Sequence, residues 1–336
     1  MKLVAGVDGG NTKTVAVACD EEGGRLGIGR GGCGNWEVIG EKNAAATITE
    51  VMEEAISGAG GRRGDVVHAQ MGLAGQDWPE DEPRMRGALV EAGWHCDMTL
   101  ENDGFLTVRR GAPEGYGIGV TAGTGICAAI VRPDGEKYFY GAFTDLGGGR
   151  DIDGEALTAV IRAEDGRGPA TALTEGVLRA TGHESVRSLV HAIHREGRSP
   201  GYGALRRALF AAARQGDGVA VDIVTRFGAE LALCGTNLMR RYGLEEEDPA
   251  VVASGSLFMR TGPLLFEAFR SEVLAAAPRA RVILTDYPPV MGALRGALGV
   301  AGWETPQVWQ GINREVSGRG WFRASTDAGA EGGSGE

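Results

Sequence analysis

The sequence predicts an α/β protein of two similar lobes, each built on a mixed β-sheet flanked by helices. The first observation behind this is a near-repetition: residues 3–20 and 116–133 both read as an apolar strand, a Gly/Thr/Asn turn and a second apolar strand. The second is that helix and strand patterns alternate after each copy. The third is the length, because a chain of 336 residues is long for a single hydrophobic core.

The first lobe is expected over residues 1–116. Three strands come first and alternating helices and strands follow, an order that makes a mixed sheet with helices packed on it. The helix over 41–58 has apolar residues at helical spacing, from Ala44 and Ile48 to Ala55. The predicted strands cover 2–8, 13–19, 25–30, 65–75 and 97–103, and the other predicted helices cover 80–92 and 104–111.

The second lobe is expected over 117–312, where the strand pattern restarts. The turn Pro133-Asp134-Gly135 predicts a hairpin, and a mostly helical insertion is expected over about 151–242. Residues 313–336 are expected to form an extension, with a small, polar and acidic tail over 324–336 that is predicted to be disordered. The predicted strands cover 117–122, 125–132, 136–141, 250–256 and 281–285, and the predicted helices 257–275 and 290–298.

Composition narrows the class of protein. Hydrophobic and charged contents of 43% and 24% are ordinary globular values, and no apolar run approaches the roughly 20 residues that span a bilayer. A formal net charge of −11 disfavours a nucleic-acid surface, which needs clustered Lys and Arg. The five cysteines form no C-x-x-C pair, so neither a zinc site nor a disulfide framework is indicated. The start has too short an apolar stretch for a secretory signal, so we expect a cytoplasmic protein with no membrane or nucleic-acid partner.

The turn VDGGNTKT (7–14) is the strongest local signal. Asp8 ends an apolar strand, where a carboxylate could hold Mg²⁺ through water. The plain alternative is a hairpin turn with a polar tip. The second turn, TAGTG (121–125), favours the interpretation that both are phosphate-binding turns, because glycines let the backbone approach an anion and hydroxyls and N–H groups donate to it. The residues expected to contact ATP in these turns are Asn11, Thr12, Lys13 and Thr14 in the first and Gly123, Thr124 and Gly125 in the second.

The motif ENDG (101–104) places Asp103 at the carboxyl end of a strand, directly before a helix. An isolated Asp at this position commonly caps the helix by accepting a backbone N–H. Ligand sites also gather at the carboxyl ends of strands, where a desolvated Asp can act as a general base. Both interpretations stay open on this motif alone.

Three further segments carry candidate ligand contacts. GCGNWEVIG (32–40) brings Asn35 and Trp36 into a helix, either as turn residues or as an amide and a ring for sugar hydroxyls. FTDLGGGRDIDGEAL (143–157) is a three-glycine loop with Asp145, either a hinge or a ligand loop. VVASGS (251–256) could let a flat base lie against Ser254 and Gly255, or it is an ordinary strand-to-helix turn.

Together these motifs resemble the actin, sugar-kinase and heat-shock-chaperone superfamily, and within it the N-acetylglucosamine kinase branch of the BadF/BadG/BcrA/BcrD-type ATPase family. The resemblance covers about residues 3–300 and rests on the order and spacing of several motifs. They are VDGGNTKT, GCGNWEVIG, GLAG (72–75), ENDG, VTAGTG, ARQGDGVAVDIV (213–224), VVASGS and PPVMGALRGAL (288–298).

The resemblance implies a two-lobed actin-like (ribonuclease H-like) ATPase fold with a nucleotide cleft between the lobes, and ATP-dependent phosphorylation of an amino sugar, normally at the 6-hydroxyl. Carried over by position, Asp103 takes the proton from that hydroxyl, and Asp8 organises Mg²⁺. Asn35, Trp36 and Asp145 belong to the sugar site. Thr12 and Thr124 contact phosphates, Ser254 and Gly255 belong to the adenosine segment, and a homodimer is expected.

One departure bears on the sugar. Where the family commonly shows Gly-Asp-Glu-Gly-Ser, this chain has Thr144-Asp145-Leu146-Gly147-Gly148. Because Leu146 replaces an acid, N-acetylglucosamine, glucosamine and related hexosamines all remain candidates. The family also contains iron–sulfur activators of 2-hydroxyacyl-CoA dehydratases and benzoyl-CoA reductases, which is the alternative function. That function needs clustered cysteines, whereas Cys127 is expected in a strand and Cys234 within a helix.

Overall fold

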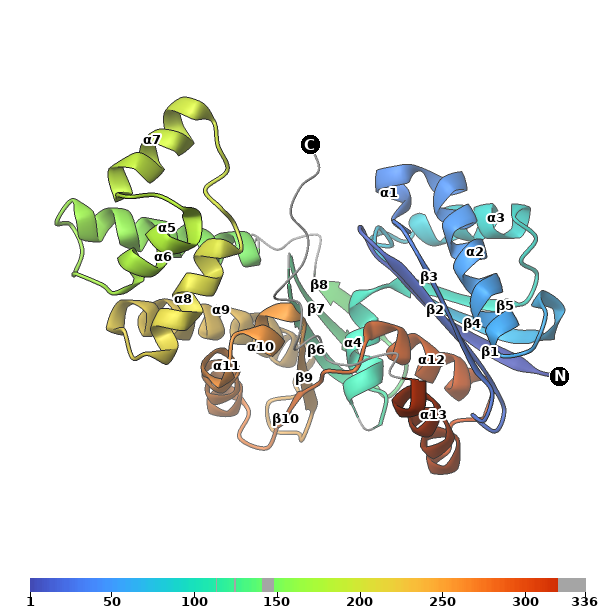
Figure 1. The fold of residues 1–336 in the computed structure, drawn as a ribbon. Helices are drawn as coiled ribbons and strands as arrows, with labels where there is room; N and C mark the ends of the chain where they lie inside the picture. The colour runs from blue at the N-terminus through green and yellow to red at the C-terminus, as the bar shows by residue number, and fades with distance from the viewer. Residues whose placement is uncertain (113, 124, 141–147, 320–336) are drawn as a thin grey trace. The chain divides into compact units, whose positions relative to one another are not determined.

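The computed structural model describes residues 1–112, 114–123, 125–140 and 148–319, which divide into two compact units (Figure 1). Unit 1 comprises Met1–Arg110 together with the described residues from Asp286 to Arg319. Unit 2 comprises Gly111–Thr285. The chain therefore leaves unit 1 once and returns to it.

Unit 1 is built on a five-stranded sheet in the order β3-β2-β1-β4-β5. The first three strands pair antiparallel, and β4 and β5 add in parallel on the other side of β1. The strands are β1 (Leu3–Gly9), β2 (Thr14–Asp20), β3 (Leu26–Gly31), β4 (Val66–Leu73) and β5 (Asp97–Asn102).

Helices cover both faces of this sheet. Because side chains alternate along a strand, Leu3, Ala5 and Val7 of β1 enter one core while Val4 enters the other. The first core contains α2 (Glu41–Gly58) and α3 (Asp81–Glu91), and the second contains α12 (Pro289–Val300) and α13 (Pro306–Arg319). Unit 1 also holds α1 (Trp36–Ile39), the 3₁₀ turn Arg63–Asp65 and α4 (Gly104–Gly111).

Unit 2 repeats the same topology. Its sheet has the order β8-β7-β6-β9-β10, in which β6, β7 and β8 pair antiparallel and β9 and β10 add in parallel. The strands are β6 (Gly117–Ala122), β7 (Ile126–Val131), β8 (Lys137–Tyr140), β9 (Ala250–Ser254) and β10 (Arg281–Leu284). The duplication predicted from the two strand–turn–strand segments is thus confirmed in the strand order of both sheets.

The helical insertion of unit 2 lies between β8 and β9. Its buried apolar residues form one continuous core with β6, β7 and β9, so the insertion is packed onto the sheet rather than standing apart from it. The insertion contains α5 (Gly149–Glu164), α6 (Leu173–Thr181), α7 (Val186–Glu196), α8 (Ala204–Arg214) and α9 (Gly218–Tyr242), and α10 (Ser256–Arg260) and α11 (Pro263–Ala276) follow β9.

Four details differ from the sequence-based expectation. The helix expected over 290–298 in the second lobe is α12, and it packs on β1 of unit 1, where Leu294 is fully buried. The unit boundary falls after Arg110 rather than at residue 116. The single helix expected over 257–275 is two helices, because Gly262 adopts φ +83° and Pro263 starts a new helix. The extension expected from residue 313 belongs in part to α13, which begins at Pro306.

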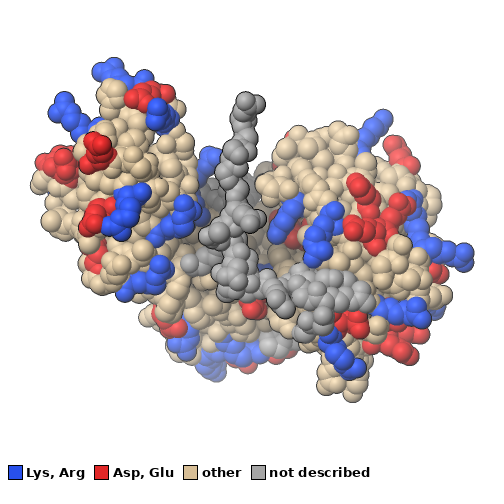
Figure 2. Space-filling model, viewed as in Figure 1, with Lys and Arg blue, Asp and Glu red and all other residues tan. Residues whose placement is uncertain are grey.

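Within the described residues no helix is long and apolar enough to cross a membrane. On the face shown in Figure 2, Lys and Arg side chains are interspersed with Asp and Glu side chains over the described surface.

A close backbone contact between β1 and α12 in unit 1 yields a stability prediction. A Cβ added at Gly6 of β1 would lie 2.3 Å from the backbone nitrogen of Leu294 in α12. Gly6→Ala should therefore push α12 off the sheet and lower the free energy of unfolding by about 1–3 kcal/mol. The matched control is Gly24→Ala, where an added Cβ meets no atom within 4 Å. Urea unfolding measures both variants, and equal midpoints for the two would contradict the packing described here.

Candidate functional site

The carboxyl ends of β1, β4 and β5 meet at one edge of the unit 1 sheet. Gly9 is in register with Leu73, and Leu73 with Asn102. The loops leaving these strands are joined by backbone hydrogen bonds: Gly34 donates to the carbonyl of Gly10 at 2.9 Å, and Ala74 donates to that of Gly9 at 2.8 Å. The turn 7–14, the turn 32–40 and the ENDG motif therefore lie at the same edge.

Two of the carboxyl groups at this edge, Asp8 and Asp103, have strongly raised pKa values. Burial raises the pKa of Asp8 from 3.8 to about 6, and the charges of Lys13 and Arg110 partly oppose this. Burial raises the pKa of Asp103 from 3.8 to about 7, and the negative charges of Asp8 and Asp77 add to the rise. Asp103 is therefore a carboxyl group that can exchange a proton near neutral pH.

Asn102, a residue not singled out from the sequence, connects the segments on either side of Asp103 by hydrogen bonds to Gly104 and Asp77. Its Oδ1 accepts from the N–H of Gly104 at 2.8 Å, and its Nδ2 donates to Oδ1 of Asp77 at 2.7 Å. Asp103 also accepts a hydrogen bond from the N–H of Gly104. Capping of α4 is thus shared with Asn102, so the cap interpretation does not account for Asp103 by itself.

Asp77 was also missed in the sequence. Burial raises its pKa, with Glu37 and Asp81 adding to the rise and the hydrogen bond from Asn102 opposing it. The buried carboxylate of Asp81 accepts from the N–H groups of Asp77 and Trp78 at 3.0 and 2.7 Å, which fixes this loop. The signal available in the sequence was the polar Gln-Asp pair directly after GLAG.

Asn35 joins the turn 32–40 to the turn 7–14. Its Oδ1 accepts from the N–H of Glu37 at 2.8 Å, which caps α1, and its Nδ2 donates to Oδ1 of Asn11 at 2.7 Å. Gly75 adopts φ +82°, and a Cβ there would lie 2.5 Å from that same Oδ1. Asn35 is 5% exposed, so it holds both turns in place at the edge.

Trp36 is partly buried beside these loops. Its indole Nε1 donates to the carbonyl of Gly75 at 2.6 Å, and the guanidinium of Arg84 lies 4.3 Å from the ring centroid. The indole thus holds the Gly75 loop through its N–H, and its ring makes a cation–π contact with Arg84.

The four residues predicted for phosphate in the first turn fall into two groups. Asn11, Thr12 and Lys13 are exposed at the tip of the turn. Thr14 is fully buried, its hydroxyl donates to the carbonyl of Gly32 at 2.8 Å, and a Cβ at Gly34 would lie 2.4 Å from that hydroxyl. Thr14 thus anchors the turn, while the other three side chains lie at its exposed tip.

The second turn lies at the equivalent edge of the unit 2 sheet. The hydroxyl groups of Thr121 and Ser254 lie 3.0 Å apart, and the N–H of Gly123 donates to the carbonyl of Gly125 at 2.9 Å. Gly255 adopts φ +99°, and an added Cβ would lie 2.3 Å from the carbonyl oxygen of Ala122. The structure therefore brings the second turn and the segment Ser254–Gly255 together. Thr124 and Asp145 lie outside the described residues.

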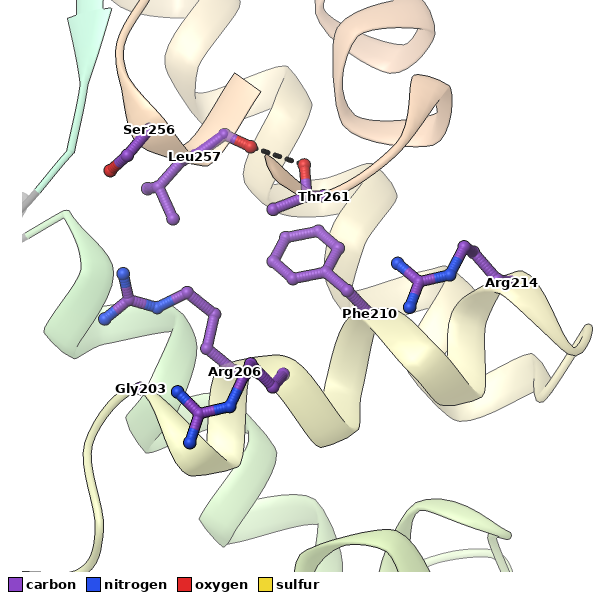
Figure 3. A pocket seen from close by; sticks show the side chains of 8 residues that line it. Gly203, Arg206, Phe210, Arg214, Ser256, Leu257 and Thr261 are labelled. Atoms are coloured by element: carbon purple, nitrogen blue, oxygen red, sulfur yellow. Dashed lines mark hydrogen bonds between the residues drawn. The ribbon is translucent and has the colours of Figure 1, made fainter. Parts of the chain in front are cut away.

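A pocket of about 420 Å³ opens directly after this segment (Figure 3). Ser256 and Leu257 form one wall, and α8 contributes Phe210 and arginines to the other. One of these arginines, Arg206, pairs with the fully buried Asp153 at 2.7 Å. The residues lining the pocket are Gly203, Arg206, Arg207, Phe210, Arg214, Ser256, Leu257 and Thr261.

Among the described residues no group of three or more His, Cys, Asp or Glu side chains could enclose a metal ion. Mg²⁺ is commonly held by one or two carboxylates together with substrate phosphates and waters. The single carboxylate of Asp8, at the end of β1 beside the first turn, fits that mode of binding.

The matched motifs, the duplicated sheet and the two turns agree with a comparison against protein families, which matches the chain over residues 5–301. The chain belongs to the BadF/BadG/BcrA/BcrD ATPase family.

Curated relatives are similar over most of their length. The chain is 25% identical to an N-acetyl-D-glucosamine kinase of Dictyostelium discoideum, over 88% of this chain and 98% of that protein. It is 24% identical to an N-acetylmuramic acid/N-acetylglucosamine kinase of Clostridium acetobutylicum, over 88% and 97%. It is 25% identical to a glucosamine kinase of Vibrio cholerae, over 69% and 79%.

Solved structures share the fold. A ROK family glucokinase from Streptomyces griseus, in complex with glucose and AMPPNP, has a TM-score of 0.55 at 20% identity and covers 88% of this chain and 98% of its own. A ROK hexokinase from Thermus thermophilus has a TM-score of 0.55 at 22% identity, over 89% and 99%. These likenesses confirm the two-lobed actin-like fold.

The two hydrogen bonds of Asn35 predict a structural effect. Asn35→Ala removes the cap of α1 and the bond to Asn11, so the free energy of unfolding should fall by about 1–2 kcal/mol. The control is Asn43→Ala, which loses one exposed bond to the carbonyl of Ile39 and should change little. Thermal unfolding compares the two, and equal melting temperatures would mean that Asn35 does not hold the turns together.

Proposed function

We propose that this chain is an ATP-dependent amino-sugar kinase that phosphorylates the 6-hydroxyl of N-acetylglucosamine or a related hexosamine. The observation that carries the proposal is the Asp103 carboxyl, whose pKa is raised to about 7 beside a donor-rich Gly/Thr turn. The three curated relatives, all amino-sugar kinases by name, support the same reaction.

In the proposed mechanism Asp103 is the general base. As the sugar oxygen forms its bond to the γ-phosphorus, the proton of that hydroxyl moves to the Asp103 carboxylate. The bond between the γ-phosphorus and the bridging oxygen breaks, and ADP leaves with that oxygen. A base with a pKa near the working pH combines a useful ionised fraction with the strongest proton affinity, which is the condition general-base catalysis favours.

Phosphoryl transfer otherwise needs positioning and neutralisation of charge. In unit 1, Thr12 and Asn11 would donate to phosphate oxygens, and Lys13 would supply a positive charge. Asp8 would hold Mg²⁺, which neutralises phosphate charge when bound. In unit 2, the turn Gly123–Gly125 would donate to phosphates, and Ser254 and Gly255 would adjoin the adenosine.

The sugar would be held by Asn35 and Asp145, with Trp36 supporting the loop beside them. Asn35 is already bonded to Asn11 and to the N–H of Glu37. Its contribution to the sugar site is therefore expected to come through the position of these turns as well as through a direct bond. A coupled ADP-release assay over a panel of hexosamines and N-acetylhexosamines tests the function and identifies the sugar.

The variant Asp103→Asn separates catalysis from folding. Loss of the base should lower kcat by about 10²–10⁴-fold while ATP and sugar still bind. Because the pKa of Asp103 is raised from 3.8 to about 7, the folded state disfavours its ionised form, and the native charge destabilises the fold at pH 8. The melting temperature of Asp103→Asn at pH 8 should accordingly not fall. Wild-type turnover in this variant would remove Asp103 from the mechanism.

The pH dependence of the reaction should report the environment of Asp103. The base is active when ionised, so kcat/KM should rise with pH through about 7. Asp77→Asn removes a negative charge that raises the pKa of Asp103, so the acid limb should move to lower pH. The exposed hairpin variant Asp134→Asn serves as control and should leave the profile in place. A limb that does not move in Asp77→Asn would assign the titration to another group.

A further inference from the structure

The pocket in unit 2 has one face of α8 as a wall. Arg206, Phe210 and Arg214 are spaced four residues apart, so they lie on the same side of the helix. In Figure 3 these side chains project from α8 on the side of Leu257 and Thr261. Phe210 is 3% exposed and contributes an aromatic side chain to the lining of the pocket.

The charged groups of this wall are all arginines. Arg206 is held by Asp153, whose two oxygens accept from its guanidinium at 2.7 and 3.4 Å. Arg207 and Arg214 are exposed and form no ion pair with any described residue. Of the described residues that line the pocket, none is Asp, Glu, Asn or Gln. The pocket thus offers an excess of positive charge and of hydrogen-bond donors.

Side-chain acceptors are few by comparison. The lining holds two hydroxyl groups, Ser256 and Thr261, and the hydroxyl of Thr261 donates to the carbonyl of Leu257. A guanidinium has five donors and no acceptor. A purine with a 6-oxo group presents two adjacent acceptors, O6 and N7, which an arginine can bind with two hydrogen bonds. The 6-amino group of adenine is a donor and has no such match on an arginine.

We propose that this pocket accepts 6-oxopurine nucleotides, so that ITP and GTP donate the phosphoryl group at least as well as ATP. The proposal rests on the proposed function, in which the nucleotide base enters this pocket after Ser254 and Gly255. The transfer itself is unchanged: the bond from the γ-phosphorus to the bridging oxygen breaks, the bond to the sugar oxygen forms, and IDP or GDP leaves in place of ADP.

ITP is the sharpest probe, because it differs from ATP mainly at position 6 of the base. With one sugar and equal Mg²⁺, kcat/KM for ITP should equal or exceed that for ATP. Arg214→Gln and Arg207→Gln each place an amide oxygen, an acceptor, on the wall. At least one of them should lower the ratio of kcat/KM for ITP to that for ATP by about 10-fold. Arg187→Gln, on α7 outside the pocket, is the matched control and should leave the ratio unchanged.

Two outcomes overturn the inference: wild-type kcat/KM for ITP more than 10-fold below that for ATP, or a ratio unchanged in both pocket variants. Both leave the kinase proposal standing, provided that ATP supports turnover. If no nucleotide supports phosphorylation of any sugar on the panel, the proposed function fails instead. Calorimetry then decides the present inference by itself: ITP binding as tightly as ATP supports it, and ATP binding more than 10-fold tighter refutes it.

Discussion

A buried ion pair fixes the part of unit 1 on which the proposed chemistry depends. The carboxylate of Glu101, at 6% exposure, accepts from Arg109 of α4 at 2.7 and 3.0 Å and from Gln70 of β4 at 2.8 Å. The carbonyl of Arg109 in turn accepts from Arg295 of α12 at 3.0 Å. Because Glu101 is the penultimate residue of β5, two residues before Asp103, this network helps to fix the position of the β5–α4 turn. Breaking such a buried pair would leave an uncompensated charge, so the network specifies one arrangement of β4, β5, α4 and α12.

The carboxyl groups at the strand edge are destabilising when ionised, because burial disfavours their charged forms. Burial raises the pKa of both Asp8 and Asp103, and the negative charge of Asp8 adds to the rise at Asp103. Arg110, in the last turn of α4, faces Asp8 and Asp286, and burial lowers its pKa to about 10. A fold selected only for stability would not gather these groups at one edge. Local rules are commonly broken where a protein binds or reacts, which is why this edge is the strongest site candidate in unit 1.

Local pattern was sufficient for most elements, and it failed where packing partners decide the outcome. The predicted helices over 41–58 and 104–111 coincide with α2 and α4, because apolar spacing and strand ends mark them clearly. The apolar residues of α12 are spaced as clearly, but this spacing does not predict that the helix packs on β1 of unit 1. Val308 and Ile312 of α13, four residues apart and both buried, were a usable signal for a helix that was not predicted.

The same distinction applies to the site residues. Asp103, Asn35 and the first turn could be placed at one edge, since parallel strands end together. The burial of Thr14 also follows from alternation, because Ala16 and Ala18 on the same side of β2 are in the core. The two hydrogen bonds of Asn102, to Gly104 and to Asp77, could not be predicted from the sequence, because they depend on the orientation of its side-chain amide in the folded protein.

The two units share one strand order but differ in the side chains that line the corresponding edge of each sheet. In each unit a glycine packs too closely to a neighbouring strand to admit a Cβ. An added Cβ would lie 2.4 Å from the Thr14 hydroxyl at Gly34 in unit 1, and 2.3 Å from the carbonyl oxygen of Ala122 at Gly255 in unit 2. The edge that this contact shapes bears carboxyl groups in unit 1, suited to a base and a cation. In unit 2 it adjoins a pocket lined by arginines, suited to an acceptor-rich, anionic ligand. Since the strand order is the same, the difference lies in the residues that follow each strand, and the roles proposed for the two halves of the protein rest on these residues.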